Sequence, residues 1–391
     1  MIEREPLRRE FEERYGRAPR LFRAPGRVNL IGEHTDYNGG FVLPMAIDRE
    51  TIVAAAARTD RRVRLYSLNS RDGAEFDLDS PGEPRRGHWI DYVEGVAQAL
   101  EGRGLRLSGA DLLIHSDVPP GSGLSSSAAL EVSAGLALAS VAGLEVDRVQ
   151  LALAGQEAEH TYVGAKVGIM DQFIAALGRE GHALLIDCRT LDATSIPLDT
   201  TETVVAICDS TVRHELASSE YNTRRAECER GVELLRESLP GIRELRDVSV
   251  ADFERYEGQL PEPVRRRCRH VVRENERTLL AADAFTRGDL ASAGELMNRS
   301  HDSLRDDYEV SCPELDALVE IARDFGAGVL GSRMTGGGFG GSTVSLVRRH
   351  ALEDFKQAIA DRYRERTGLQ PKIFVSEAGD GAGEITRNDE R

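Results

Sequence analysis

Residues 26–40 read GRVNLIGEHTDYNGG, a segment that gathers an arginine, two carboxylates, an imidazole and two amides between glycines. A hydrophobic core does not need such a segment, and glycines let a backbone fold tightly around a small polar molecule. Burying a sugar costs roughly a few kcal/mol for each unpaired hydroxyl, so a sugar site needs short polar side chains in fixed positions. The segment therefore indicates a polyol site with Glu33, His34 and Asp36 as contacts, and with Arg27 as the partner of an anion.

A second glycine-rich segment, PPGSGLSSSAA at residues 119–129, follows a predicted strand at 111–117 and leads into a predicted helix at 126–142. Its glycines and serines offer N–H and O–H donors, and the helix N-terminus adds a partial positive charge. The segment lacks the Gly-Lys-Ser/Thr ending of a P-loop. A plain serine cap would also fit, but two prolines, two glycines and three serines exceed what a cap requires. We interpret it as a phosphate loop of another kind.

The third glycine segment is GSRMTGGGFGG at residues 331–341. In isolation it could be a flexible hairpin. Flexible loops seldom carry Arg, Met and Phe together, so we expect its glycines to let the C-terminal part approach the nucleotide or the sugar closely.

Two carboxylates are candidates for phosphoryl-transfer chemistry, which needs an oxygen-ligated magnesium, a cationic clamp and an acceptor for the proton of the nucleophile. Asp171 lies in GIMDQFI at 168–174, at a predicted helix start, where a simple helix-terminal charge would also fit. Glu159 ends a predicted helix and could pair with the Ser127 hydroxyl around magnesium, although most helical glutamates are solvated. No G-x-S-x-G elbow and no H-E-x-x-H motif occurs.

Composition narrows the class of protein. The 391 residues are 40% hydrophobic and 30% charged, with a net charge of -16, which disfavours binding to nucleic acid or to an anionic membrane. The five cysteines have no C-x-x-C spacing, so we expect reduced thiols. The charged N-terminal segment has no apolar stretch typical of a signal peptide. We expect a cytoplasmic, monomeric protein with small-molecule partners only.

The order of predicted elements indicates an α+β protein of two domains with mixed sheets. Strand-like segments dominate residues 1–200, and charged amphipathic helices dominate the first part of residues 201–391. No Pro/Ser-rich linker marks the boundary, so we expect the two domains to pack closely around an inter-domain cleft that holds the active site. The tail after Glu377 is rich in Gly, Glu and Asp, and we expect it to be frayed. The predicted strands and helices lie at 21–24, 51–57, 63–67, 89–100, 111–117, 126–142, 148–161, 181–188, 203–209, 342–347, 352–366 and 372–376.

The three segments, in this order, resemble the motifs of the galactokinase, homoserine kinase, mevalonate kinase and phosphomevalonate kinase (GHMP) superfamily. GRVNLIGEHTDY at 26–37 resembles the sugar signature of the galactokinase family in particular. The resemblance spans nearly the whole chain. Each glycine segment alone would be weak support, but the ordered set is specific.

The resemblance implies a role for each matching residue. Arg27 would stabilise the transferring phosphoryl group and orient Asp171, the base toward the C1 hydroxyl of the sugar, while Ser127 and Glu159 would bind Mg²⁺. The implied sugar contacts are Glu33, His34, Thr35, Asp36 and Tyr221. The implied nucleotide contacts are Ser67, Trp89, Gly121, Ser122, Gly123, Leu124, Ser125, Ser126 and Ser127. Trp89 is the only tryptophan and would stack near the adenine, although an ordinary core aromatic is the simpler interpretation.

The implied activity is an ATP-dependent phosphorylation of α-D-galactose at C1. Two alternatives stay open. A kinase of N-acetylgalactosamine or a related galactose-configured sugar would share these motifs, because the space near C2 is not visible in a sequence. A non-catalytic galactose sensor would be expected to lose part of the phosphate loop or the base, and this chain keeps Arg27, Ser127, Glu159 and Asp171.

Overall fold

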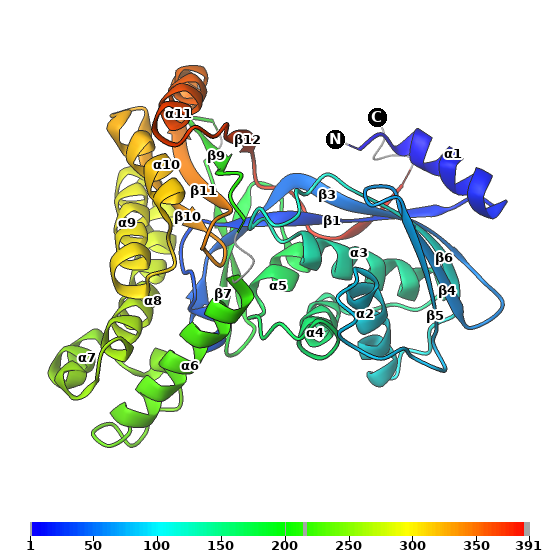
Figure 1. The fold of residues 1–391 in the computed structure, drawn as a ribbon, viewed down its shortest axis with the longest axis horizontal. Helices are drawn as coiled ribbons and strands as arrows, with labels where there is room; N and C mark the ends of the chain where they lie inside the picture. The colour runs from blue at the N-terminus through cyan, green and yellow to red at the C-terminus, as the bar shows by residue number, and fades with distance from the viewer. Residues whose placement is uncertain (1, 200, 214–216, 387–391) are drawn as a thin grey trace.

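The computed structural model describes residues 2–199, 201–213 and 217–386. It is an α+β protein with mixed sheets, as predicted, and its N-terminal and C-terminal parts lie side by side along the long axis (Figure 1). The long strands β1 (Arg20–Asn29) and β3 (Pro44–Ala57) run from the outer edge of the N-terminal part toward the C-terminal part. They deliver the residues that follow β1 to the junction of the two parts.

The N-terminal part is built on a six-stranded sheet with the order β13-β1-β3-β6-β4-β5. All pairs are antiparallel except β4 and β6, which run parallel. The other four strands are β4 (Arg62–Ser67), β5 (Asp72–Asp77), β6 (Ala110–Ser116) and β13 (Gly383–Ile385).

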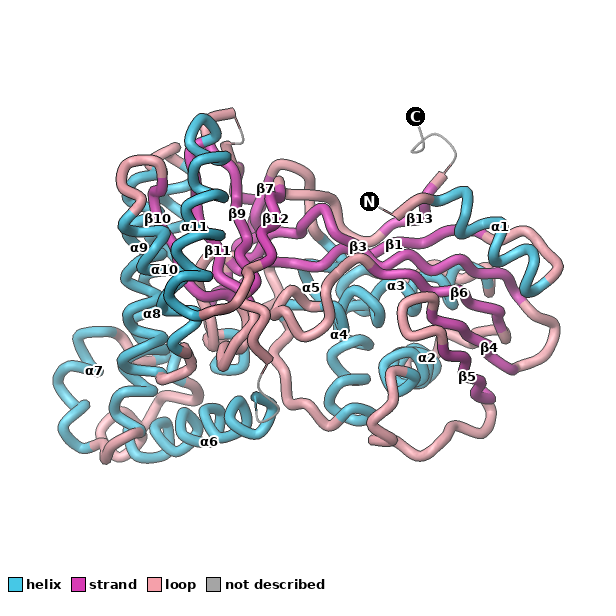
Figure 2. Tube along the Cα trace, turned by 45° about the horizontal axis from the view of Figure 1, so that its top comes forward, coloured by secondary structure: helices cyan, strands magenta, loops and turns pink. Residues whose placement is uncertain are grey.

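Both faces of this sheet are apolar, and both are covered. Because side chains alternate along a strand, Phe22 and Val53 face one core, whereas Leu21 and Ile52 face another. Four helices cover the first face, and the N-terminal helix covers the other (Figure 2). The four are α2 (Ile90–Gly102), α3 (Ser126–Val141), α4 (Arg148–Ala158) and α5 (Met170–Leu177); the N-terminal one is α1 (Arg4–Tyr15).

The C-terminal part is built on a four-stranded antiparallel sheet with the order β10-β11-β9-β12, and a three-stranded sheet β2-β7-β8 lies at the junction. Helices α10 and α11 cover one face of the four-stranded sheet, and α8 and α9 contribute to the core on the other. The strands are β2 (Phe41–Val42), β7 (His182–Asp187), β8 (Ala193–Pro197), β9 (Thr203–Asp209), β10 (Val329–Thr335), β11 (Ser342–Arg348) and β12 (Lys372–Ser376). The helices are α6 (Ala217–Leu235), α7 (Val250–Tyr256), α8 (Val264–Thr286), α9 (Leu290–Ser303), α10 (Pro313–Asp324) and α11 (Leu352–Thr367).

Short helical turns complete the chain. Two of them are π-helical, η2 (Glu159–Val163) and η5 (Leu304–Tyr308). The 3-10 turns are η1 (Asp36–Asn38), η3 (Leu245–Asp247), η4 (Glu257–Gln259) and η6 (Arg349–Ala351). The helix predicted at 148–161 is thus α4 followed directly by η2, and Glu159 is the residue at which the α-helix changes to a π-helix.

The structure corrects two sequence-based expectations. Residues 331–335 are not a loop, because they form most of β10 and pair with β11, and only 336–341 make the glycine turn. The tail is not frayed up to residue 386, since β13 pairs with β1. That pairing returns the end of the chain to the N-terminal sheet, and the boundary near residue 200 stays a prediction. Two predicted strands are longer than expected, because β1 ends at Asn29 rather than at residue 24 and β3 begins at Pro44 rather than at residue 51. The other predicted elements appear within a few residues of their expected bounds.

The cysteines and the helices bear on two further expectations. All five cysteines are free thiols, as expected. Among the described residues, every helix is too short or too polar to cross a bilayer.

Candidate active site

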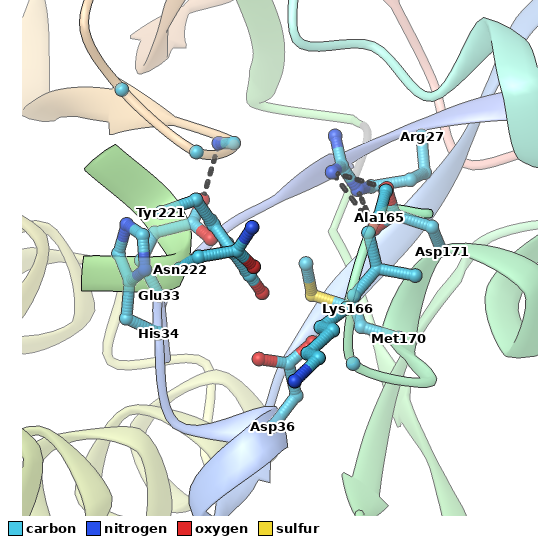
Figure 3. A pocket seen from close by; sticks show the side chains of 15 residues that line it. Arg27, Glu33, His34, Asp36, Ala165, Lys166, Met170, Asp171, Tyr221 and Asn222 are labelled. Atoms are coloured by element: carbon cyan, nitrogen blue, oxygen red, sulfur yellow. Dashed lines mark hydrogen bonds and ion pairs between the residues drawn. The ribbon is translucent and has the colours of Figure 1, made fainter. Parts of the chain in front are cut away.

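A cavity of about 250 Å³ opens where the two parts of the chain meet (Figure 3). The segment after β1, the loop before α5, helix α6 and the glycine turn before β11 all reach it. The lining residues are Arg27, Glu33, His34, Asp36, Ala165, Lys166, Val167, Gly168, Met170, Asp171, Tyr221, Asn222, Gly336, Gly337 and Gly338.

Arg27 and Asp171 form a bidentate salt bridge in the cavity wall, drawn with dashed lines in Figure 3. The Nε atom of Arg27 donates to Oδ1 of Asp171 at 2.8 Å, and Nη2 donates to Oδ2 at 2.9 Å. Arg27 is buried, whereas the Asp171 side chain keeps 28% of its surface exposed. The pair therefore fixes a carboxylate that still reaches the cavity.

The same arginine holds the phosphate loop. Its backbone N–H donates to the Leu124 carbonyl at 3.1 Å, and its Nη1 donates to the Gly123 carbonyl. Ser125 donates its hydroxyl proton to Oδ2 of Asp171 at 2.5 Å. One guanidinium thus ties the carboxylate and the loop into a single rigid unit.

The N-terminus of α3 is left open. Ser125 occupies the cap position with a φ of 61°, and no side chain of the described residues caps the helix there. This excludes the serine-cap interpretation, because the Ser125 hydroxyl is bound to Asp171 instead. The first N–H groups of α3 and its partial positive charge remain available to an anion.

The phosphate loop packs backbone against backbone on the third glycine segment. A Cβ added at Gly336 would lie 3.0 Å from the Gly123 carbonyl oxygen, and one at Gly341 would lie 3.0 Å from the Ser122 carbonyl oxygen. Both glycines have positive φ values, 84° in each case. A side chain at either position would be strained and would crowd the phosphate loop, so these glycines serve a close approach to that loop, whereas the predicted approach to the nucleotide or the sugar stays a prediction.

The polar segment after β1 supplies the opposite wall. Oε1 of Glu33 accepts a hydrogen bond from the Gly336 N–H at 2.7 Å, which ties this wall to the glycine turn. The fully buried Arg333 guanidinium lies 3.4 Å from the same oxygen and balances its charge. The Gly336 N–H and the Arg333 guanidinium together offset the cost of burying the Glu33 carboxylate, which would be unfavourable without partners.

His34 and Asp36 differ from solvent-exposed residues in their protonation. Burial lowers the pKa of His34 to about 3, so the imidazole is uncharged at neutral pH. Burial, with the nearby charge of Asp171, raises the pKa of Asp36 to about 7. Hydrogen-bond donors from a bound polyol would favour the ionised form of Asp36. Gly168 is required beside it, because a Cβ there would lie 1.7 Å from Oδ2 of Asp36.

Helix α8 anchors this segment from behind, a role that the sequence did not indicate. Oε1 of Glu274 accepts from the Gly32 N–H at 3.0 Å, Oδ1 of Asn275 accepts from the Phe41 N–H at 3.0 Å, and His270 donates to the Glu33 carbonyl at 3.1 Å. These partners are more than 230 residues apart, so no local pattern could have revealed them.

Ser127 and Glu159 form a second polar pair below the phosphate loop. The Ser127 hydroxyl donates to Oε1 of Glu159 at 2.9 Å, as predicted, and the Gln172 amide donates to the same oxygen at 3.3 Å. Burial raises the pKa of Glu159 to about 7, although the Ser127 hydroxyl lowers it. A buried carboxylate of this kind fits a cation, and its oxygen ligands match those that Mg²⁺ prefers.

Thr35 does not reach the cavity. Its hydroxyl lies 2.8 Å from the Gly32 carbonyl oxygen and 2.6 Å from that of Phe41, and Thr35 itself is fully buried. The predicted sugar contact of Thr35 is therefore not supported, because its only polar side-chain atom holds the turn together. The other four predicted sugar contacts, Glu33, His34, Asp36 and Tyr221, all line the cavity.

The predicted nucleotide contacts lie outside this cavity. The Leu124 side chain is buried in the core, and the Ser122 hydroxyl donates to the Pro119 carbonyl at 2.7 Å, so only their backbone groups are available. Ser67 lies at the end of β4, beside Ile114 of β6, the strand that leads toward the phosphate loop. Trp89 precedes α2, packs partly on the main core, and donates its Nε1–H to Asp72 at 3.0 Å.

Several lining residues were missed in the sequence. Lys166 is exposed and lines the cavity beside Ala165 and Val167. Asn222 follows the predicted Tyr221 on α6 by one residue, and Met170 precedes Asp171. Their proximity to predicted site residues was the only available signal.

Comparison with known proteins agrees with this geometry. Residues 9–57 match the family description "Galactokinase galactose-binding signature", and residues 91–179 and 281–365 match the N-terminal and C-terminal GHMP kinase domains. A galactokinase of Chloroflexus aurantiacus is 54% identical over 382 residues, with 97% of each chain covered. The chain belongs to the galactokinase family. Another family member, from a Roseiflexus species, is 51% identical over 389 residues and covers 99% of each chain.

Solved structures place the fold in the same family. The crystal structure of Lactococcus lactis galactokinase complexed with galactose superposes with a TM-score of 0.94 at 39% identity, covering 97% of this chain and 99% of that one. Methanococcus jannaschii mevalonate kinase superposes with a TM-score of 0.66 at 18% identity, covering 93% of this chain and 99% of that one. The second likeness concerns the fold alone. The two-domain GHMP kinase fold expected from the motifs is therefore confirmed.

Proposed function

We propose that this galactokinase-family kinase transfers the γ-phosphoryl group of ATP to the C1 hydroxyl of α-D-galactose. The observation that carries the proposal is the position of Arg27, which binds Asp171 in the sugar-sized cavity and the Gly123 carbonyl of the phosphate loop at the same time. The Arg27 side chain thus connects the proposed proton acceptor, Asp171, to the proposed anion site, the phosphate loop. Phosphoryl transfer depends on such positioning more than on a strong base.

The residues of the cavity would act as follows. Glu33, His34, Asp36 and Tyr221 would bind the sugar hydroxyls and aim C1 at the phosphate loop. Asp171 would accept the proton of the C1 hydroxyl at Oδ1 or Oδ2 as the oxygen attacks. Arg27 would hold that carboxylate and stabilise the charge on the transferring group. The open N-terminus of α3 would bind the phosphates through backbone N–H groups.

Magnesium would be held by Ser127 and Glu159. Bound there, it would offset the charge of the ATP phosphates during transfer. ATP itself would lie along residues 121–127, with Trp89 and Ser67 on the side of the adenosine. The cytoplasmic location and the monomeric state stay predictions.

A kinase of N-acetylgalactosamine or a related galactose-configured sugar remains the alternative substrate assignment. The galactose complex of the Lactococcus lactis relative favours galactose. A non-catalytic sensor is disfavoured, because Arg27, Ser125 and Asp171 are connected by hydrogen bonds and none of this machinery is missing.

A coupled ADP-release assay with galactose, glucose, N-acetylgalactosamine and mevalonate in parallel tests the proposal. We expect turnover with galactose, dependence on Mg²⁺, and an α-1-phosphate product identified by phosphorus NMR. Activity on another of these substrates without activity on galactose would overturn the substrate assignment. If the protein bound galactose but released no ADP with any of the four substrates, the result would favour the sensor.

A further inference from the structure

A chain of hydrogen bonds runs from the sugar-side histidine into the buried interior of the C-terminal part. Nδ1 of His34 lies 2.8 Å from the Tyr37 hydroxyl, and that hydroxyl lies 2.7 Å from the Tyr308 hydroxyl. The chain ends at Sγ of Cys228, which lies 3.2 Å from the Tyr308 hydroxyl. Tyr37 belongs to η1, Tyr308 to η5 and Cys228 to α6, so three separate elements converge behind one imidazole. The roles assigned above do not use this chain.

The His34 ring is held in one orientation. Its backbone has a φ of 63°, a conformation that a histidine rarely adopts, and the Asn38 amide donates to its carbonyl at 2.9 Å. The ring packs against Tyr308 and Tyr221 with centroid distances of 4.8 and 5.5 Å. Strained residues that are fixed on several sides are typical of functional sites.

The donor-to-acceptor direction of this series of hydrogen bonds decides which ring nitrogen of His34 carries the single proton. The low pKa of His34 leaves the ring neutral, and burial raises the pKa values of Tyr37 and Tyr308, which keeps both phenols protonated. In one direction Cys228 donates to Tyr308, Tyr308 to Tyr37, and Tyr37 to Nδ1 of His34. In the other direction every donor becomes an acceptor.

The first direction is favoured by the strengths of the groups at the two ends. An unprotonated imidazole nitrogen is a good acceptor, whereas a thiol sulfur is a weak one. A phenol proton therefore gains more from His34 than from Cys228. The first direction leaves Nδ1 without a proton and places the proton on Nε2.

Nε2 itself is buried and makes no hydrogen bond of regular geometry with the described residues, although the Gly337 backbone in the cavity wall is near enough to raise the pKa of the imidazole. Nε2 belongs to a residue that lines the cavity next to Glu33, as Figure 3 shows, and the Asp36 carboxylate lines the same cavity. Carboxylates offer only acceptors, whereas a sugar hydroxyl also needs a donor toward its oxygen. A fixed Nε2–H would supply that donor.

We propose that Tyr37 and Tyr308 are positioning residues that hold the proton of His34 on Nε2, so that His34 donates a hydrogen bond to a hydroxyl of the bound sugar. The identity of the sugar rests on the proposed function, but the hydrogen-bond chain does not. The two tyrosines act through His34 and need not touch the sugar.

Steady-state kinetics of Tyr37→Phe and Tyr308→Phe test the effect on the sugar. Both variants keep the aromatic ring and lose only the hydroxyl. We expect the KM for galactose to rise about tenfold in Tyr37→Phe and about threefold in Tyr308→Phe, with kcat within about twofold and the KM for ATP unchanged. The matched control is Tyr15→Phe, which removes a hydroxyl bound to the Leu112 carbonyl at 3.1 Å in the N-terminal sheet and should change none of these constants. An unchanged KM for galactose in Tyr37→Phe, or equal changes in the control, would overturn the proposal.

Nitrogen NMR of the protein labelled at the histidine rings tests the proton position directly, without sugar. The His34 signal is assigned by its loss in His34→Gln. We expect an Nε2–H ring in the wild type and in Tyr15→Phe, and a mixture containing Nδ1–H in Tyr37→Phe. A wild-type ring protonated at Nδ1 would contradict the proposal. If Nε2–H were found in a protein that failed to phosphorylate galactose, the proposed function would fall and this inference would stand.

Discussion

Glu159 gives a prediction in which stability and catalysis oppose each other. Glu159 as a residue is 6% exposed, and burial raises the pKa of its carboxyl from 4.5 to about 7. Between these pH values the native state binds a proton that the unfolded state has released, so the free energy of unfolding falls as the pH rises from about 4.5 to 7. Glu159→Gln removes that titration while it keeps the shape and an acceptor for Ser127.

The magnitude follows from the shift of about 2.5 units, at about 1.4 kcal/mol for each unit, which gives about 3 kcal/mol above pH 7. With an unfolding entropy of about 2.1 cal/mol/K per residue over 391 residues, this corresponds to about 4 °C in Tm. We expect metal-free Glu159→Gln to melt about 4 °C above the wild type at pH 8 and at the same temperature near pH 4.5.

Differential scanning calorimetry in EDTA, from pH 4.5 to 8.5, measures this gap. Glu295→Gln, at an exposed position of α9, is the matched control and should follow the wild type at every pH. The same Glu159→Gln protein should lose most of its Mg²⁺-dependent turnover. A variant that melts below the wild type at pH 8, or a gap that does not change with pH, would refute the reasoning.

Two further predictions concern the support of the sugar site. Gly168→Ala would place a Cβ 1.7 Å from Oδ2 of Asp36, so we expect calorimetry to show at least about tenfold weaker galactose binding with ATP binding intact, while Gly102→Ala, which has open space, changes neither. Glu274→Gln would leave the buried Arg277 without its ion pair. Burial alone would raise the pKa of Glu274, but the Arg277 charge helps to lower it to about 2. The lowered pKa adds about 3 kcal/mol to the free energy of unfolding above pH 4.5, and this contribution is lost as the pH falls toward 2. The variant should therefore melt about 4 °C lower at pH 7, and a loss that persists unchanged at pH 2 would contradict this origin.

The sequence predicted those parts of the site whose chemistry is concentrated in short segments. Arg27 and Asp171 are 144 residues apart, and each stood out as a charge in an apolar or glycine-rich context. The Ser127–Glu159 pair was predicted for the same reason and is present at 2.9 Å. Four of the six strands of the N-terminal sheet, β1, β3, β4 and β6, were predicted from apolar or alternating segments, whereas β5 and β13 were not.

The supporting contacts could not be predicted, because they depend on residues that look ordinary along the chain. Glu274 lies in a charged amphipathic helix where most glutamates are solvated, and only the tertiary structure brings it to Gly32. Thr35 resembled a sugar contact because it lies between two of them, yet the tight turn takes its hydroxyl. Strand β13 was missed since its three residues carry no alternating pattern long enough to detect.

The central claim is that Asp171, held by Arg27, accepts the proton of the sugar hydroxyl during transfer. Rapid-quench measurement of a single turnover in Asp171→Asn tests it most directly, with galactose and ATP affinities measured in parallel. We predict affinities within about threefold of the wild type and a rate of phosphoryl transfer lower by at least about two orders of magnitude. A variant that binds both substrates and transfers at the wild-type rate would contradict the claim.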